Sequence, residues 1–173
     1  GAILACNISA GIYTTNNPEA CSYISKHSKA ELVVLEGNKQ LIKYVNANKD
    51  LEYLKAIVVW GETVDQSIAT GTGVPVYSFQ DFMKLGDGVE DSIVDERMNI
   101  AKPGNCCTLI YTSGTTGSPK AVMVSHDNIT WTVKTMLDSY IPMNHTDRTV
   151  SYLPLSHVAA QAIDIHCCMY LGC

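Results

Sequence analysis

The chain has 173 residues, of which 46% are hydrophobic and 17% are charged. This balance excludes a chain that is disordered throughout, and the length favours a single domain. The net charge is −5 and no lysine or arginine cluster occurs, which argues against a basic face for nucleic acid and against an electrostatic membrane anchor.

The first half of the chain, taken in order, alternates strand-like and helix-like segments. We expect strands over residues 31–35, 55–60 and 74–77, because these are short, apolar and rich in branched side chains. After a break at Gly37-Asn38, the spacing of Leu41, Ile42 and Val45 predicts a helix over 39–48. The rest of this half is expected as a polar loop over 61–73, a helix over 79–85 capped by Ser78, and an exposed acidic stretch over 86–99.

The second half continues the alternation. An apolar strand is expected over 106–111, then a polar loop, then a helix-like segment. That helix should run over about 128–139, capped by Ser125 or Asp127. Another strand is expected over 148–153, and Ser156-His157 should open a final helix. Buried strands separated by helices predict an α/β fold, in which a mainly parallel sheet is flanked by helices.

The cysteines do not predict a disulfide framework or a zinc ribbon. Their count is odd, no Cys-x-x-Cys occurs, and two pairs are adjacent. His166-Cys167-Cys168 lacks the fourth ligand and the spacing of a metal site. We therefore expect buried, reduced thiols in an intracellular protein. The seven positions are Cys6, Cys21, Cys106, Cys107, Cys167, Cys168 and Cys173.

The loop after residues 106–111 has the composition of a phosphate-binding loop. Its glycines let the backbone approach an anion, successive backbone N–H groups form a concavity, and the lysine adds positive charge. The order Pro119-Lys120-Ala121 differs from the Gly-x-x-x-x-Gly-Lys-Ser/Thr pattern and disfavours a P-loop kinase or NTPase. The expected phosphate ligands are Thr112, Ser113, Gly114, Thr115, Thr116, Gly117, Ser118, Pro119 and Lys120.

This loop resembles the nucleotide-phosphate loop of the adenylate-forming enzymes, the superfamily of acyl-CoA synthetases, peptide-synthetase adenylation domains and luciferases. Residues 112–120 match that pattern throughout, and Ala121 departs from it because the family usually has glycine there. A second family-like segment, Ser151 to His157, follows some thirty residues later. Taken alone, His157 would be a helix-start residue with a satisfied hydrogen bond, whereas in the family this histidine lies near the acyl and adenylate pocket.

Within the superfamily, the chain is most similar to the bubblegum-type long-chain acyl-CoA synthetases. The upstream residues 11–24 and His27-Ser28-Lys29-Ala30 agree with this resemblance. It implies that residues 1–173 form part of a large AMP-binding N-terminal domain that is incomplete at both ends and lacks the C-terminal domain. The resemblance further implies ATP-dependent conversion of a long-chain fatty acid, through acyl-adenylate, to acyl-CoA with release of AMP and pyrophosphate.

The same resemblance assigns roles to individual residues. Thr115, Lys120 and His157 are the implied catalytic residues, and Thr115 or Thr116 is the implied hydroxyl ligand to Mg²⁺. ATP, Mg²⁺, the fatty acid and coenzyme A are the implied ligands. The downstream glutamate, ribose-binding aspartate and catalytic lysine motifs of the family do not occur in the chain, so we expect the 173 residues alone to be inactive.

Two other interpretations remain open at this point. One is an adenylate-forming enzyme for another acid, such as an aryl or amino acid. The other is a non-catalytic product, a truncated isoform or degenerate copy acting as a binding module. The thiol-rich composition and the lack of a signal peptide predict a cytosolic location, and a lipid substrate favours peripheral contact with the endoplasmic reticulum or other membranes. The sequence does not indicate an oligomeric state.

Overall fold

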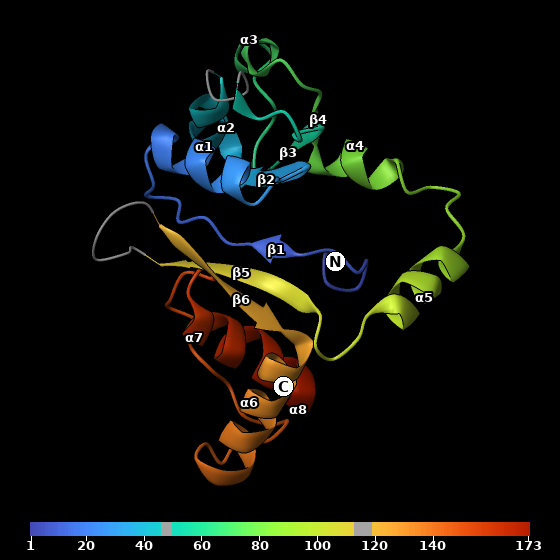
Figure 1. The fold of residues 1–173 in the computed structure, drawn as a ribbon, viewed down its shortest axis with the longest axis vertical. Coiled ribbons are helices and arrows are strands. Elements are labelled where there is room, and N and C mark those ends of the chain that lie inside the picture. The colour runs from blue at the N-terminus through green and yellow to red at the C-terminus, as the bar shows by residue number, and fades with distance from the viewer. Residues whose placement is uncertain (46–49, 113–118) are drawn as a thin grey trace. The chain divides into compact units, whose positions relative to one another are not determined.

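The computed structural model describes residues 1–45, 50–112 and 119–173, and it divides the chain into two compact units. One unit is Thr14–Val89. The other combines Gly1–Tyr13 with Glu90–Cys173 (Figure 1). Each unit contains a three-stranded sheet built from the described residues.

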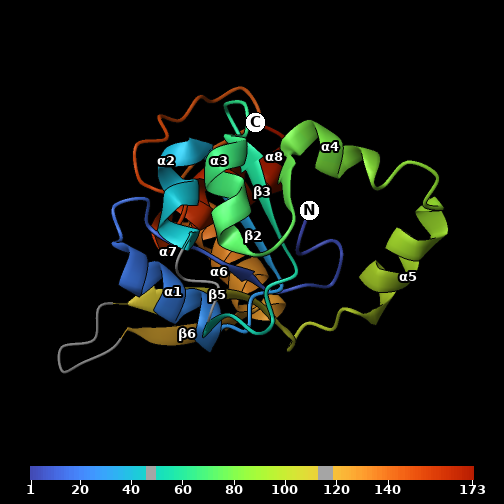
Figure 2. The ribbon, with the colours of Figure 1, turned by 90° about the horizontal axis from the view of Figure 1, so that it is seen from above.

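The sheet of the unit Thr14–Val89 is parallel, in the order β2 (Leu32–Glu36), β3 (Ala56–Trp60), β4 (Val76–Ser78). Side chains from β2 and β3, including Val33, Leu35, Ile57, Val58 and Val59, form its buried core. Short helices α2 and α3 lie side by side near β2 and β3 (Figure 2). The helices are α1 (Pro18–His27), α2 (Gly37–Leu41), α3 (Gln66–Ala69) and α4 (Phe79–Lys84), with 3-10 turns at Ile42–Tyr44 and Thr70–Thr72.

Most predictions for this unit are confirmed, with two corrections. Ser78 caps α4 as expected, since its hydroxyl accepts the Asp81 N–H at 3.1 Å. The helix predicted over 39–48 instead begins at Gly37 and passes into a 3-10 turn, and residues 46–49 lie outside the described residues. The predicted loop over 61–73 contains α3, because the Asp65 carboxylate accepts the Ser67 N–H at 2.9 Å and starts a helical turn.

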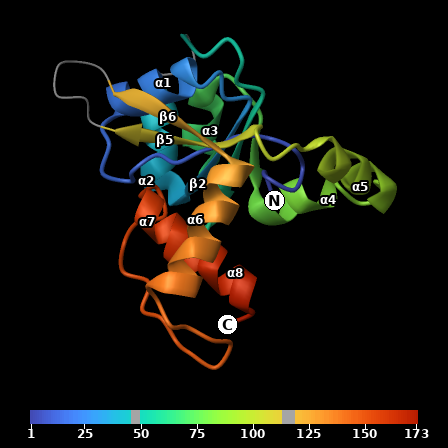
Figure 3. The ribbon, with the colours of Figure 1, turned by 60° about the horizontal axis from the view of Figure 1, so that its bottom comes forward.

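The other unit has the sheet order β1 (Ser9–Ala10), β5 (Cys106–Thr112), β6 (Lys120–Ser125). Strand β1 runs parallel to β5, and β6 runs antiparallel to it. Two helical segments lie together on one side of this sheet, α6 (His126–Ser139) and the run α7 (Val158–Ala160), a π-helix (Gln161–Cys167) and α8 (Cys168–Leu171) (Figure 3).

Two features of this unit differ from the sequence-based expectations, and one open alternative is decided. The residues directly after the loop form strand β6 instead of a helix, and α6 follows it. Ser125, and not Asp127, caps α6 through a reciprocal capping box with Asn128. Residues 148–153 are not a strand, because their backbone pairs with no neighbouring strand among the described residues and both Val150 and Tyr152 are more than 80% exposed.

The acidic stretch 86–99 is exposed as predicted, and it also contains helix α5 (Asp91–Ile100), which buries no residue. All seven thiols are free, but only Cys21, Cys107 and Cys167 are buried, so the expectation of burial is wrong for the exposed Cys173. Three of the four strand pairings in the described chain are parallel, and the predicted α/β class is confirmed. No helix among the described residues is both long enough and apolar enough to cross a bilayer.

Candidate functional site

The predicted phosphate loop joins the ends of two paired strands. Thr112 is the last residue of β5 and Lys120 is the first of β6, and the two lie opposite each other in the antiparallel ladder. Buried Cys107, Ile110 and Tyr111 anchor β5 in the unit's core. The remaining predicted ligands, Ser113, Gly114, Thr115, Thr116, Gly117 and Ser118, lie outside the described residues.

The described ends of this hairpin suit an anion. Thr112 presents an exposed hydroxyl, Lys120 an exposed ammonium group, and Pro119 is half-buried between the loop and β6. None of the three ion pairs between described residues involves Lys120. The sequence contains no aspartate or glutamate from residue 106 to residue 126. An ammonium group among hydroxyls and without neighbouring carboxylates in sequence favours a negatively charged ligand.

Ala121, the one departure from the family pattern, does not disturb the hairpin. It lies in β6 and pairs with Tyr111. Its backbone is not among the positive-φ residues of the described chain. The strand therefore does not need a glycine at this position for conformational reasons.

A close backbone contact brings the segment of His157 to the same end of the sheet. Ala10 of β1 pairs with Leu109, so Gly11 lies toward the carboxyl end of β5, where Thr112 is found. A Cβ atom built on Gly11 would lie only 2.9 Å from the Cα of Ser156. Ser156 is buried, and the views place α7 on the loop side of β5 and β6 (Figures 1 and 3).

His157 caps the helical run that begins at Val158. The Nδ1 of its ring accepts the backbone N–H of Ala159 at 3.1 Å. The backbone N–H of His157 donates to the Pro154 carbonyl at 2.8 Å. The expectation of a helix-start residue with a satisfied hydrogen bond is confirmed. Because Nδ1 is an acceptor, the neutral ring carries its proton on Nε2, which can donate to a further partner. His157 also lies at the N-terminal, positive end of the helical run, and this end favours a negatively charged ligand.

A small cavity lies between β5, β6, α6 and the helical run that begins at Val158. Its volume is about 90 Å³, and most of its surface is apolar. A water molecule occupies about 30 Å³ of liquid, so the cavity has room for only a few such groups. The lining side chains come from Thr108, Val124, Asn128, Ile129, Thr132, Val158, Gln161, Ala162 and His166.

His166 is the residue of this cavity that sequence reasoning missed, since we considered it only as a metal ligand. Burial lowers the pKa of its imidazole, which favours the neutral form. Helical spacing could have identified it, because Val158, Gln161 and His166 recur on one face of the run. In the described part of the chain, no three His, Cys, Asp or Glu side chains gather as a metal-binding cluster.

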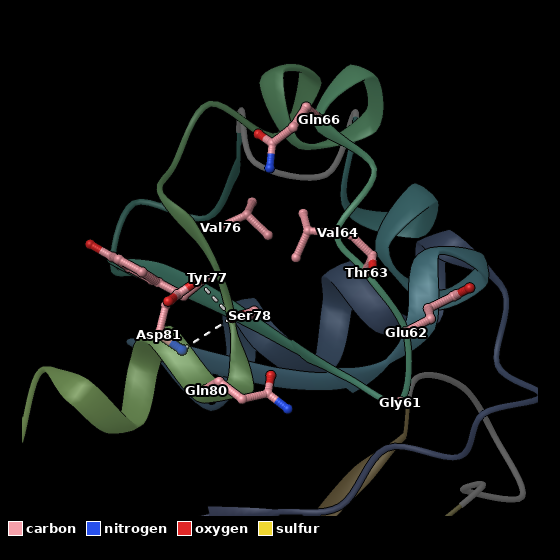
Figure 4. Close-up of a pocket in the computed structure, with 10 residues that line it drawn as sticks. All are labelled: Gly61, Glu62, Thr63, Val64, Gln66, Val76, Tyr77, Ser78, Gln80 and Asp81. Carbon is pink, nitrogen blue, oxygen red and sulfur yellow. Dashed lines mark hydrogen bonds between the residues drawn. The ribbon is translucent and has the colours of Figure 1, made fainter.

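A larger hollow of about 620 Å³ lies in the unit Thr14–Val89, beyond the carboxyl ends of β3 and β4 (Figure 4). Ligands often bind at this edge of parallel sheets. Gln66 and Gln80 reach toward it from opposite sides (Figure 4). Its two carboxylates already have structural roles: Glu62 accepts the Asn38 N–H, and Asp81 accepts from Ser78 and Lys84, both at 2.8 Å. The hollow is lined by none of the residues that the sequence predicts as phosphate ligands or catalytic residues.

Comparison with known proteins identifies the family of the chain. The family model described as AMP-binding enzyme matches residues 1–173. The long-chain-fatty-acid–CoA ligase ACSBG2 of Xenopus laevis is 45% identical over 175 aligned positions, which cover 99% of this chain and 23% of the relative. The ligase ACSBG1 of Mus musculus is 42% identical, over 95% of this chain and 23% of the relative. The chain thus spans about a quarter of the length of these relatives.

Solved structures agree in fold. A putative long-chain-fatty-acid CoA ligase from Rhodopseudomonas palustris matches 93% of this chain and 36% of its own, with a TM-score of 0.70 and 15% identity. ATP-bound MatB from the same organism matches 95% of this chain and 29% of its own, with a TM-score of 0.58 and 18% identity.

Proposed function

Since the chain belongs to the AMP-binding enzyme family, we propose that its parent protein is a long-chain fatty acid–CoA ligase. The observation that carries the proposal is the 42–45% identity to long-chain ligases across nearly all of the chain. A fatty acid carboxylate attacks the α-phosphorus of ATP and pyrophosphate leaves. The thiol of coenzyme A then attacks the acyl carbon, loses its proton, and AMP leaves.

The hairpin between β5 and β6 holds the triphosphate in this proposal. Thr112 to Lys120 surround the β- and γ-phosphates, and the Lys120 ammonium offsets the charge that grows on the departing pyrophosphate. A carboxylate is a poor nucleophile for a crowded anionic phosphorus. Positioning and charge neutralisation therefore supply most of the catalysis.

Thr115 or Thr116 would supply a hydroxyl oxygen to Mg²⁺, and the charge of the bound ion would help to stabilise the leaving pyrophosphate. Hydroxyl oxygens are suitable ligands for this ion. Because no carboxylate occurs between residues 106 and 126, the negative ligands must come from the phosphates or from elsewhere in the protein. The donor set of the loop fits a metal held mainly through its nucleotide.

His157 orients the reacting carboxylate or the α-phosphate through its Nε2–H. Its Nδ1 is already engaged by the Ala159 N–H, so the ring is held in one orientation. Proton transfer by this histidine is not required. The small cavity between β5, β6, α6 and the helical run has a volume of only about 90 Å³, so a long acyl chain must be bound mostly by other residues.

Cytosolic location and peripheral membrane contact belong to the same proposal. They rest on the lipid nature of the substrate and on the free thiols.

The test of the loop is ATP-dependent palmitoyl-CoA formation by the full-length protein. Lys120→Ala is expected to lower kcat/KM by about 10²-fold or more, because it removes a charge that acts on the transition state, and Thr115→Ala should lower it too. Lys102→Ala is the matched control: this exposed lysine precedes β5, at the opposite end of the strand from the loop. Equal activity of Lys120→Ala and Lys102→Ala would overturn the assignment.

A second variant separates the two roles of His157. In His157→Asn, the side chain can still accept the Ala159 N–H, since asparagine is a good helix cap, but the Nε2 donor is lost. We expect unchanged thermal stability and a fall of about tenfold or more in kcat/KM. Loss of stability with unchanged kcat/KM would assign His157 to capping alone.

The choice of acid tests the proposed function itself. If the folded parent protein is active only with aryl or amino acids, one of these is its substrate. If it shows no activity with any acid, the result favours a non-catalytic module.

A further inference from the structure

A turn at the end of α8 brings Cys173 next to Cys168. Gly172 adopts a left-handed conformation, with φ of +71°. The backbone N–H groups of Gly172 and Cys173 both donate to the Cys168 carbonyl, at 2.9 and 3.2 Å. In this pattern at a helix C-terminus, the residue after the left-handed one contacts the side chain five residues before it. Here these two residues are Cys173 and Cys168.

The two thiols are neighbours with different surroundings. The Cys173 thiol is exposed and lies 3.9 Å from the Cys168 carbonyl oxygen. The half-buried Cys168 thiol points to the Ile163 carbonyl at 3.5 Å and to the Thr149 hydroxyl at 3.9 Å. Desolvation and the side-chain interaction with Cys168 raise the pKa of the Cys173 thiol.

Cys167 is poorly placed to compete. It is fully buried, and successive residues of a helix point in different directions. Burial, with the charges of Cys168 and Cys173, also raises the pKa of the Cys167 thiol. Unlike the exposed Cys173, Cys167 is closed off from an oxidant in solution.

We propose that Cys168 and Cys173 form a reversible disulfide when hydrogen peroxide is present. One thiolate attacks the peroxide oxygen, giving a sulfenic acid and releasing hydroxide. The second thiolate attacks that sulfenic sulfur and releases a second hydroxide, which leaves the S–S bond. Each sulfur loses one electron, and the peroxide takes up both and, with protons, becomes two water molecules. The bond closes a ring over residues 168–173 and fixes the last turn of the helical run.

The modification is independent of the proposed ligase activity. Its chemistry needs only two neighbouring thiols and an oxidant. The site lies at the end of the run opposite His157, so the two functions can be tested separately.

The test is mass spectrometry of the full-length protein after brief treatment with hydrogen peroxide, alkylation of the remaining thiols, and trypsin digestion. The peptide that begins at Thr149, after Arg148, contains all three cysteines of the run. We expect this peptide to carry one alkyl group, on Cys167, and a disulfide that leaves it two hydrogen atoms lighter than the same singly alkylated peptide with two free thiols. A thiol reductant should restore three alkylated cysteines.

Matched variants decide which sulfurs pair. Cys168→Ser and Cys173→Ser should each abolish the mass loss, whereas Cys106→Ser, a half-buried thiol on β5, should leave it unchanged. Persistence of the disulfide in Cys168→Ser would mean that Cys167 is the partner and would overturn the proposal. Full alkylation of all three thiols in the peroxide-treated wild type would overturn it as well.

Discussion

At the scale of single residues, the site depends on a close approach that only glycine permits. The Cα of Ser156 lies 2.9 Å from the position of a Cβ on Gly11, and His157 is the next residue along the chain. Real Cβ atoms do not approach backbone atoms so closely, and backbone cannot rotate away as a side chain can. The position of His157 is therefore coupled to the absence of a side chain on Gly11.

We predict that Gly11→Ala destabilises the protein by about 1–3 kcal/mol, which is the usual cost of overpacking. It should also lower ligase activity, because the Ser156–His157 segment must move. Gly104→Ala is the control in the same unit, since nothing lies within 4 Å of a Cβ at that position. Thermal melting and palmitoyl-CoA formation by the full-length protein measure the two effects, and equal behaviour of both variants would contradict the proposed coupling.

Single-residue features were predictable where the cause is local. The Ser78 and Ser125 caps and the helix-start role of His157 follow from short side-chain-to-backbone patterns that the sequence displays directly. The contact between Gly11 and Ser156 joins residues 145 positions apart, and no local pattern carries it. The helical spacing of His166 is a local pattern, but the cavity that it lines is assembled from two strands and two helical segments, which no local pattern shows.

At the scale of elements, the two errors that concern strands share one physical cause. Residues 120–125 form β6 because β5 offers them an antiparallel partner, whereas residues 148–153, which also contain apolar side chains, pair with no strand in the described chain. A strand is stable only when its backbone groups find partners, and the sequence of the segment does not contain that information. Strands β2 and β3 were predicted because continuous branched runs are typical of parallel sheets.

A buried hydrogen bond ties α1 to the 3-10 turn Ile42–Tyr44 and makes this unit sensitive to alkaline pH. The Ser25 and Tyr44 hydroxyls lie 3.1 Å apart, and Tyr44 is 4% exposed. Burial raises the pKa of Tyr44 to about 12 from 10.0, although the Ser25 hydrogen bond lowers it. The neutral phenol is thus favoured in the folded state, and its contribution to stability is complete below pH 10 and lost as the pH rises from 10 to 12.

We predict that Tyr44→Phe costs about 1–2 kcal/mol at pH 8, because Ser25 loses its buried partner. The variant should also lack a loss of up to about 3 kcal/mol that the wild type undergoes between pH 10 and pH 12. Urea unfolding at both ends of this range measures the difference, with the more exposed Tyr53→Phe as control. An identical pH dependence in wild type and Tyr44→Phe would show that Tyr44 is not the responsible group.

At the scale of the whole molecule, each sheet presents apolar side chains to solvent. On β6, Met123 is 71% exposed and Val122 is 49% exposed, and on β2, Val34 is 54% exposed. The chain spans 23% of the length of the ACSBG2 and ACSBG1 ligases described above. An exposed apolar strand at a sheet edge is a template for pairing with another chain.

We therefore predict that the isolated 173 residues self-associate and are poorly soluble. Light scattering during size-exclusion chromatography should show species larger than a monomer, growing with concentration. Met123→Lys places a charge on the edge strand and should reduce this association. The control Lys102→Ala should not change it, and a monodisperse monomer of the wild-type chain would contradict the prediction.

The central claim is that this chain belongs to an enzyme that activates long-chain fatty acids as adenylates. It is tested most directly by exchange of labelled pyrophosphate into ATP, catalysed by the full-length protein without coenzyme A. Exchange should require palmitate and be far slower with an aromatic acid or with no acid. Exchange with the aromatic acid alone, or none with any acid in a folded protein, would contradict the account.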